Sequence, residues 1–252
     1  MVDGKFSNSC YLRSLDICYQ RFMEKHAAAN GGAVFSVMKD AQHVLFHAPY
    51  NKLVQKSFAR LVFNEYLTEP EAKSDPAFAA LQPFKDTLRE ASYEDVPLEK
   101  AAVAVSKAWY AEKVAPGITI PQQLGNMYTA SLYAGLMSLV VNEGAGLAGK
   151  RLLMFSYGSG LASTLFSIKV AEGAGAQLAA IAARSDIVRR LEDRVAVEPA
   201  VFNSWMETRE KLHTVEGDYT LSGSTDPEHF FEKAFFLVER TADGKRKYQQ
   251  QQ

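Results

Sequence analysis

The segment from residue 43 to residue 56 constrains the fold most, because it predicts a strand, a break and a helix in immediate succession. Residues 44–46 form a short apolar run, and the Ala-Pro pair that follows His47 does not extend a strand comfortably. Apolar positions then recur at helical spacing, so a helix is expected from Asn51 to about Leu67. His47 is therefore expected where a buried strand ends and a helix begins. In layered α/β folds, ligands bind at that edge of the sheet, here called the rim.

Two lysines follow this histidine on the expected helix. Lys52 and Lys56 are four residues apart, which places them on one face of the first helical turns. A histidine at a strand end beside two aligned lysines suits a proton-transfer group next to an anionic substrate. The same residues also suit a capped strand end with two solvated lysines, and this segment alone leaves both interpretations open.

Composition and charge narrow the class of protein. The chain has 252 residues, of which 47% are hydrophobic and 23% charged, as in ordinary globular proteins. A net charge of −1 does not indicate binding to nucleic acid or to an anionic membrane. Cys10 and Cys18 are the only cysteines, and their spacing indicates neither a disulfide framework nor a metal motif. No long apolar run or signal peptide is recognised, so a soluble intracellular protein is expected.

The rest of the chain predicts alternating helices and strands. Residues 70–97 are expected to form a variable loop with one short helix near 77–84, because they are polar and contain proline. A last strand is expected at 234–240, and the terminal glutamines 249–252 are expected to be disordered. Further helices are expected at residues 8–28, 98–114, 178–183, 187–191 and 199–212.

Two glycine-containing stretches are further candidates for ligand contact. Gly125 and Asn126 mark the point where a loop is expected to turn into an apolar helix, and amides at such a helix start can hold a carbonyl or an anion. An ordinary helix cap explains Asn126 equally well. Residues 149–171 predict a β-hairpin whose turn contains Gly158, Ser159 and Gly160. Its glycines permit close approach of the backbone to a ligand, although Gly-Ser-Gly is also simply a good turn.

Together, these stretches resemble one protein family. His-Ala-Pro-Tyr-Asn-Lys-Leu-Val-Gln-Lys at 47–56, Gly-Asn-Met-Tyr-Thr-Ala-Ser-Leu-Tyr at 125–133 and Phe-Ser-Tyr-Gly-Ser-Gly-Leu-Ala-Ser-Thr-Leu at 155–165 are similar to hydroxymethylglutaryl-CoA synthase of the eukaryotic type. The start at residues 2–12 fits the same family, so the similarity covers nearly the whole chain. The resemblance implies an α/β fold of the thiolase-like layered type and an acyltransferase that condenses acetyl-CoA with acetoacetyl-CoA. The family serves sterol, isoprenoid or ketone-body supply, and the sequence leaves these roles open.

The resemblance also implies roles for individual residues. His47 matches the histidine that polarises the acetoacetyl group and acts as acid and base near its thioester. Asn126 matches the asparagine that hydrogen-bonds the substrate carbonyl. An aldol-type addition needs such a polarised ketone and donors for the developing alkoxide. Positions that contact substrate or product match Ser7, Lys56 and Ser159, and a lysine near the CoA phosphates matches Lys52. Acetyl-CoA and acetoacetyl-CoA are the expected substrates, and no cofactor or metal is expected.

The departure from the family concerns the other half of its site. The nucleophilic cysteine and the general-base glutamate of the family lie in an N-terminal half, whereas Cys10 and Cys18 match non-catalytic cysteines. Residues 1–248 are therefore expected to form a C-terminal thiolase-like region that lacks most of the N-terminal half and is inactive alone. A non-catalytic acyl-CoA-binding or dimerisation module is the alternative, and another thiolase-superfamily condensing enzyme is a third hypothesis.

Partners and location follow from the same resemblance. We expect acyl-CoA thioesters as ligands, and either a homodimer or association with the missing N-terminal half. Apolar surface is expected where that half would pack. No nucleic acid or membrane partner is expected, and the location is expected to be cytoplasmic, with the mitochondrion as the alternative.

Overall fold

The computed structural model describes residues 4–158, 160–213, 219–220 and 232–251. The chain divides into two compact units, residues 1–192 and 193–252. The region expected over residues 1–248 spans the first unit and most of the second. All the candidate residues belong to the first unit.

The first unit is built on a three-stranded sheet with the order β1-β2-β3. Strand β1 (His43–Phe46) runs parallel to β2 (Arg151–Gly158), and β2 pairs antiparallel with β3 (Ala162–Lys169). The register joins Phe46 to Phe155 and Gly158 to Ala162. The predicted strand at 44–46 and the predicted hairpin are thereby confirmed.

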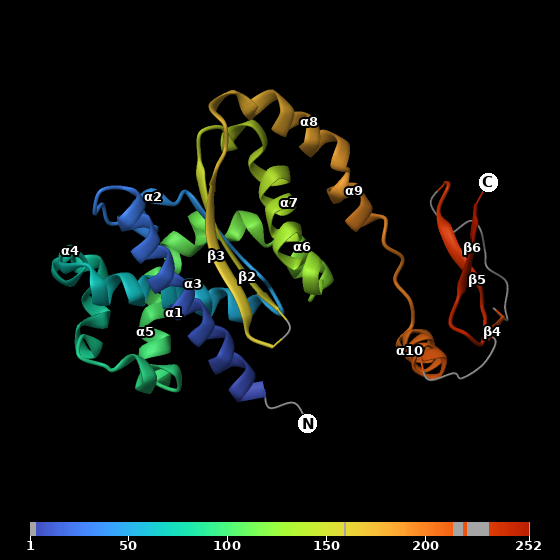
Figure 1. Cartoon of the computed structure of the whole chain (residues 1–252), viewed down its shortest axis with the longest axis horizontal. Coiled ribbons are helices and arrows are strands. Elements are labelled where there is room, and N and C mark those ends of the chain that lie inside the picture. Colours follow the sequence, from blue (N-terminus) through green and yellow to red (C-terminus); the bar gives the residue numbers. More distant parts are fainter. Residues whose placement is uncertain (1–3, 159, 214–218, 221–231, 252) are drawn as a thin grey trace. The chain divides into compact units, whose positions relative to one another are not determined.

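Alternating side chains of the strands supply two cores, one on each face of the sheet. Val44, Phe46 and Phe155 pack against α1 (Gly4–Ala29), α3 (Asn51–Thr68) and α5 (Val96–Lys113). Leu45 and Met154 face the other way, toward α7 (Ser131–Glu143) and α8 (Gly175–Ser185). The alternation is the ordinary period of two of a β-strand. Figure 1 shows the sheet between the two groups of helices.

Most of the remaining elements of the first unit are short. The helices are α2 (Val37–Asp40), α4 (Pro70–Ser74), α6 (Thr119–Leu124) and α9 (Ile187–Glu192). The 3-10 turns are η1 (Pro76–Phe84), η2 (Arg89–Tyr93), η3 (Ala115–Gly117), η4 (Tyr128–Ala130), η5 (Gly144–Leu147) and η6 (Glu172–Ala174). Residues 70–97 therefore hold three helical segments rather than the one predicted, because Pro70 and Pro76 suit the first turn of a helix and Asp75 caps η1.

The second unit contains α10 (Pro199–His213) and a sheet in the order β4-β5-β6. Its strands are β4 (Tyr219–Thr220), β5 (Phe235–Arg240) and β6 (Arg246–Gln250). The predicted helix at 199–212 and the predicted strand at 234–240 are confirmed, but that strand is not the last, because β6 follows it. The predicted disorder of residues 249–252 is wrong for Gln249 and Gln250, because both pair with β5 as part of β6.

A buried charge network fixes α1 against α3. Asp16 of α1 is 1% exposed and receives hydrogen bonds from Arg60 of α3, with Nε at 3.0 Å from both carboxylate oxygens and Nη2 at 2.6 Å from Oδ2. Asn64 and Tyr93 add hydrogen bonds to the same carboxylate at 2.7 and 2.8 Å. Buried charges are tolerated when they are paired and hydrogen-bonded in this way. The network therefore fixes the position of the helix that packs over β2 and β3.

Candidate functional site

The candidate site lies at the end of the sheet where β1 and β2 finish. The backbone N–H of His47 donates to the carbonyl of Phe155 at 2.8 Å, which extends the parallel ladder by one residue. Because β2 turns into β3 at this end, the glycine-containing turn lies on the same rim. Beyond His47, the backbone N–H of Ala48 donates to Ser131 Oγ at 2.9 Å. The first residue of α7 is therefore tied to the same rim.

His47 is enclosed by two tyrosines. Its side chain is largely buried, and its ring stacks with the rings of Tyr11 and Tyr157, each with a centroid distance of 6.5 Å and an interplanar angle of 27°. The hydroxyl of Tyr11 donates to the backbone carbonyl of His47 at 2.7 Å. Burial lowers the pKa of the His47 imidazole below its ordinary value, so the ring is neutral near pH 7. A neutral imidazole carries one donor and one acceptor nitrogen, as acid–base chemistry requires.

Tyr11 is a residue that the sequence analysis did not single out. It is 1% exposed and lies on the apolar side of α1, which made it look like ordinary core. Its ring is 4.8 Å from that of Tyr157, and burial raises the pKa of its phenol well above the usual range, so the hydroxyl remains a donor. The spacing of apolar residues in α1 could place Tyr11 in the core, but it carried no signal for a hydrogen bond to residue 47.

Asn126 lies on the loop that leads into α7. It is exposed, and its Oδ1 accepts a hydrogen bond from the backbone N–H of Tyr128 at 2.8 Å. Within the described part of the chain its amide nitrogen has no partner. The predicted helix start at residues 125–126 is wrong, because α6 ends at Leu124, Gly125 adopts a positive φ of 73°, and α7 begins only at Ser131. The loop therefore presents the Asn126 amide to solvent.

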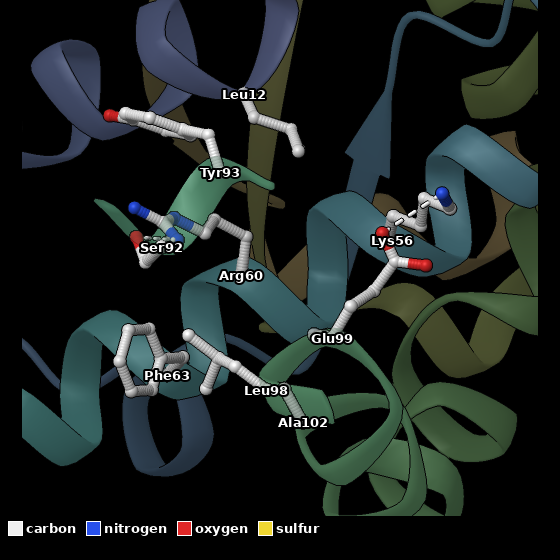
Figure 2. A pocket seen from close by; sticks show the side chains of 10 residues that line it. Leu12, Lys56, Arg60, Phe63, Ser92, Tyr93, Leu98, Glu99 and Ala102 are labelled. Carbon is white, nitrogen blue, oxygen red and sulfur yellow. Dashed lines mark hydrogen bonds and ion pairs between the residues drawn. The ribbon is translucent and has the colours of Figure 1, made fainter. Parts of the chain in front are cut away.

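The two aligned lysines have different surroundings. Lys52 is exposed, as a solvated lysine would be. Lys56 is half-buried and forms an ion pair with Glu99 of α5, with Nζ 2.9 Å from Oε2. Figure 2 shows the two side chains meeting. Both line a cavity of about 30 Å³. The two lysines, which the helical spacing places on one face, thus differ in exposure and in ion pairing.

The remaining predicted contacts lie near the start of α1 and in the hairpin turn. Ser7 is exposed on the first turns of α1, and the neighbouring Asn8 accepts a hydrogen bond from the hydroxyl of Tyr50 at 2.9 Å. This contact ties the start of α1 to the segment after His47. Ser159 lies outside the described residues.

Several large apolar side chains are exposed on the segments that meet at this rim. They lie on the first turns of α1, between His47 and α3, on the loop from α6 to α7 and in the hairpin turn. These side chains are Phe6, Tyr50, Leu124, Tyr128 and Leu161. Where such side chains form one patch, they are typical of a surface that binds a ligand or another protein segment.

The two cysteines of the chain lie in α1. Cys10 and Cys18 are half-buried in α1, and Cys18 Sγ lies 3.3 Å from Ser163 Oγ of β3. In the described residues no three His, Cys, Asp or Glu side chains lie together as a metal site would need. No helix among them has the length and apolar character to cross a membrane.

Comparison with known proteins decides the family. The family model for the hydroxymethylglutaryl-coenzyme A synthase C terminal matches residues 1–251. The chain belongs to this family. It is 42% identical to hydroxymethylglutaryl-CoA synthase A of Dictyostelium discoideum, over 98% of this chain and 49% of that protein. It is 38% identical to the cytoplasmic human synthase, over 98% of this chain and 48% of that protein. The chain thus spans about half the length of the curated relatives it matches.

Solved structures agree with this assignment. A structure described as MvaS in complex with 3-hydroxy-3-methylglutaryl coenzyme A is 28% identical, with a TM-score of 0.69 over 99% of this chain and 51% of that one. The hydroxymethylglutaryl synthase of the curacin pathway, crystallised with an apo donor carrier protein, has a TM-score of 0.68 over 99% of this chain and 52% of that one. It is only 21% identical, so this similarity concerns the fold alone. The expected thiolase-like layered α/β class, in its C-terminal portion, is confirmed.

Proposed function

We propose that this chain provides the histidine- and asparagine-bearing half of a hydroxymethylglutaryl-CoA synthase site, which condenses acetyl-CoA with acetoacetyl-CoA. The observation that carries the proposal is the position of His47, neutral and largely buried at the shared carboxyl end of β1 and β2, in a chain matched by the family over residues 1–251. Ligands of α/β folds are met at that end of the sheet.

The chemistry assigns complementary roles to the two rim residues. The methyl carbon of the acetyl group attacks the ketone carbon of acetoacetyl-CoA, and the ketone oxygen takes up a proton to become a hydroxyl. In its protonated form His47 polarises the ketone through a ring N–H and delivers that proton, which leaves the neutral imidazole that burial favours. The amide nitrogen of Asn126 donates to the substrate carbonyl and stabilises developing negative charge. Removal of the methyl proton needs a further base, which the family resemblance assigns to a glutamate of the other half.

The other candidate residues bind the thioesters in this proposal. Lys52 is exposed on the first turn of α3, where a mobile ammonium group can pair with the phosphates of CoA. Lys56, Ser7 and Ser159 contact the acyl portion or the product. The described structure in complex with 3-hydroxy-3-methylglutaryl coenzyme A supports this ligand class.

The partner and setting are part of the same proposal. Cys10 and Cys18 are half-buried thiols of α1, and neither carries the acetyl group. The chain therefore needs an N-terminal synthase half, which covers the apolar side chains at the rim, and the complete enzyme forms a homodimer. It uses no cofactor besides the two thioesters and works in the cytoplasm, a location supported by the name of the human relative.

The test is condensation activity, followed as loss of acetoacetyl-CoA in the presence of acetyl-CoA. It is measured for the chain alone and after co-expression with the N-terminal half of the Dictyostelium relative. Activity is expected only in the mixture, and His47→Ala should lower it by about a hundredfold to ten-thousandfold, the usual contribution of general acid–base catalysis. His26→Ala is the matched control, because His26 lies in the last turn of α1 and stacks on Phe22.

Two outcomes contradict the proposal in different ways. Activity of the chain alone would show that its own residues supply a nucleophile, against the reading of Cys10 and Cys18. An inactive mixture that still binds acetoacetyl-CoA would show a non-catalytic acyl-CoA-binding module instead.

A further inference from the structure

The ion pair between Lys56 and Glu99 joins two helices beside the candidate site. Lys56 lies in the second turn of α3 and Glu99 in the first turn of α5, and their charged atoms are 2.9 Å apart. The side chains are 23% and 38% exposed, so the pair is neither fully solvated nor sealed inside the core. Figure 2 shows the Glu99 carboxylate reaching up to Lys56 from the helix below.

The pair borders two hollows of the first unit. The first is the small cavity of about 30 Å³, which Lys56 and Glu99 line together with Arg60 and Phe63 among others. A more open cleft of about 230 Å³ contains the same pair together with Asn8 of α1. Asn8 is the residue hydrogen-bonded to Tyr50, so the cleft reaches the start of α1 that is tied to the segment after His47. Lys56 is thus accessible from the cleft that Asn8 lines.

The position of Glu99 is set by the local structure of α5. Asp95 caps this helix by accepting the backbone N–H of Leu98 at 2.9 Å, and a proline occupies the first turn. Leu98 and Ala102 are buried against α3 and the core. The carboxylate of Glu99 therefore projects from a fixed turn toward α3.

Lys52 provides the contrast within the same helix. It is one turn earlier, exposed, and without an ion-pair partner among the residues that the structure describes. A lysine side chain loses considerable rotamer freedom when it is held in place, so a free lysine meets a ligand at an entropic cost. Lys56 has already been ordered by Glu99, and its ammonium group keeps further N–H donors for another acceptor.

We propose that Glu99 is a positioning residue for Lys56, which it holds in the orientation that receives the acyl-CoA thioester. This inference rests on the proposed function, in which Lys56 contacts the acyl portion. Glu99 itself touches no substrate in this scheme. Its effect is pre-organisation, in which a donor is placed before the ligand arrives.

A purely structural pair between α3 and α5 would behave differently. Partly exposed ion pairs contribute little to stability, so Glu99→Gln should leave the melting temperature almost unchanged in either case. Only the positioning role predicts a kinetic effect. Misplacement of a positioning group typically costs about tenfold to a hundredfold in rate, and we expect Glu99→Gln to lower kcat/KM of the co-expressed mixture in this range.

A charge swap separates positioning from pairing. Lys56→Glu combined with Glu99→Lys restores the ion pair but moves the ammonium group to α5. We expect this double variant to melt like the wild type and to remain as impaired in kcat/KM as Glu99→Gln. Glu99→Asp, which keeps the carboxylate on a shorter side chain, should recover part of the rate. Glu71→Gln is the matched control, because Glu71 also pairs with a lysine across two helices, Lys39 at 2.9 Å, away from the cleft.

A labelling measurement tests the ordering of Lys56 without reference to activity. The whole chain is treated briefly with acetic anhydride, and acetylation of each lysine is measured by mass spectrometry. We expect Glu99→Gln to raise the labelling of Lys56 severalfold and to leave Lys52 unchanged.

The outcomes distinguish this inference from the proposed function. An inactive wild-type mixture refutes the proposed function, and the role of Lys56 in acyl-CoA binding falls with it, whatever the labelling shows. An active mixture in which Glu99→Gln matches the wild type in kcat/KM refutes the positioning role alone. Recovery of activity by the charge swap, or unchanged labelling of Lys56 in Glu99→Gln, also overturns it.

Discussion

Replacing Asp16 by asparagine tests whether the buried charge network holds α1 in place as its geometry indicates. The substitution keeps the size and shape of the side chain and removes one negative charge. In the folded protein Asp16 is 1% exposed, and Arg60 is 6% exposed while donating three hydrogen bonds to it. The variant therefore leaves a guanidinium group buried without its counter-charge.

The size of the effect follows from what remains after the substitution. Removing one partner of a buried ion pair costs about 3–5 kcal/mol of unfolding free energy, because the other charge stays desolvated. Arg60 keeps its hydrogen bond to Ser92 at 2.6 Å and its place over the Tyr93 ring at 4.5 Å from the centroid. These contacts offset part of the loss, so we expect a value near the lower end, about 3 kcal/mol.

The assay is urea unfolding of the whole chain followed by tryptophan fluorescence. The chain has two tryptophans, Trp109 in the first unit and Trp205 in the second. A Trp205→Phe background leaves Trp109, which packs 5.3 Å from the Phe78 ring, as the reporter of the first unit. Unfolding free energies are then compared between this background and the same chain carrying Asp16→Asn.

A double variant decides whether the unpaired charge is the cause. Asp16→Asn with Arg60→Met removes both charges, and we expect it to recover most of the loss, to within about 1–2 kcal/mol of the background. A double variant no more stable than Asp16→Asn would refute the reasoning. As a control, Arg21→Gln breaks the exposed pair with Glu24 and should cost less than about 1 kcal/mol.

Two further predictions concern the tyrosine beside His47 and the buried histidines. Tyr11→Phe leaves the His47 carbonyl without its donor. We expect this variant to lose about 1–3 kcal/mol of unfolding free energy in the same urea assay and to lower the condensation rate of the mixture. Unchanged stability and rate would refute the role of the hydroxyl. Burial and nearby Lys150 lower the pKa of His43 in the folded protein. As the pH falls, the unfolded chain therefore takes up the proton before the folded protein does. The unfolding free energy should then decrease as the pH drops below roughly 6.5. Urea unfolding at several pH values should show a shallower fall for His43→Asn, and equal slopes would contradict this.

The elements that carry the site could be predicted from local patterns. The apolar run at 44–46 and the helical spacing after Asn51 gave β1 and α3 nearly to the residue, because both elements bury the side chains that form the pattern. The hairpin followed from two apolar runs around a glycine-containing turn. His47 was placed at the strand end by the same argument. Its assignment as a functional residue came from the family resemblance.

What the sequence could not predict depends on contacts between distant residues. The hydroxyl of Tyr11 donates to the main-chain carbonyl of His47. Every residue has such a carbonyl, so the type of residue at position 47 does not indicate this bond. Glu99 looks like an ordinary acidic residue of a first helical turn, and only the packing of α5 on α3 brings it to Lys56. The start of α7 was misplaced because a glycine before an apolar helix can belong to the loop that leads into it. In the structure Gly125 instead ends the preceding helix α6, with a positive φ.

Hydrogen bonds within the first unit order the segments around His47. Three hydrogen bonds within the first unit fix these segments: His47 to Phe155, Ala48 to Ser131 at the start of α7, and Tyr50 to Asn8 near the start of α1. These bonds need no contribution from another chain, so the geometry around His47 is expected to form once the unit folds. The exposed apolar side chains on the same segments, by contrast, leave surface that a complete enzyme would cover. In the proposed function an N-terminal synthase half covers this surface, which is the reason to measure activity first in the co-expressed mixture.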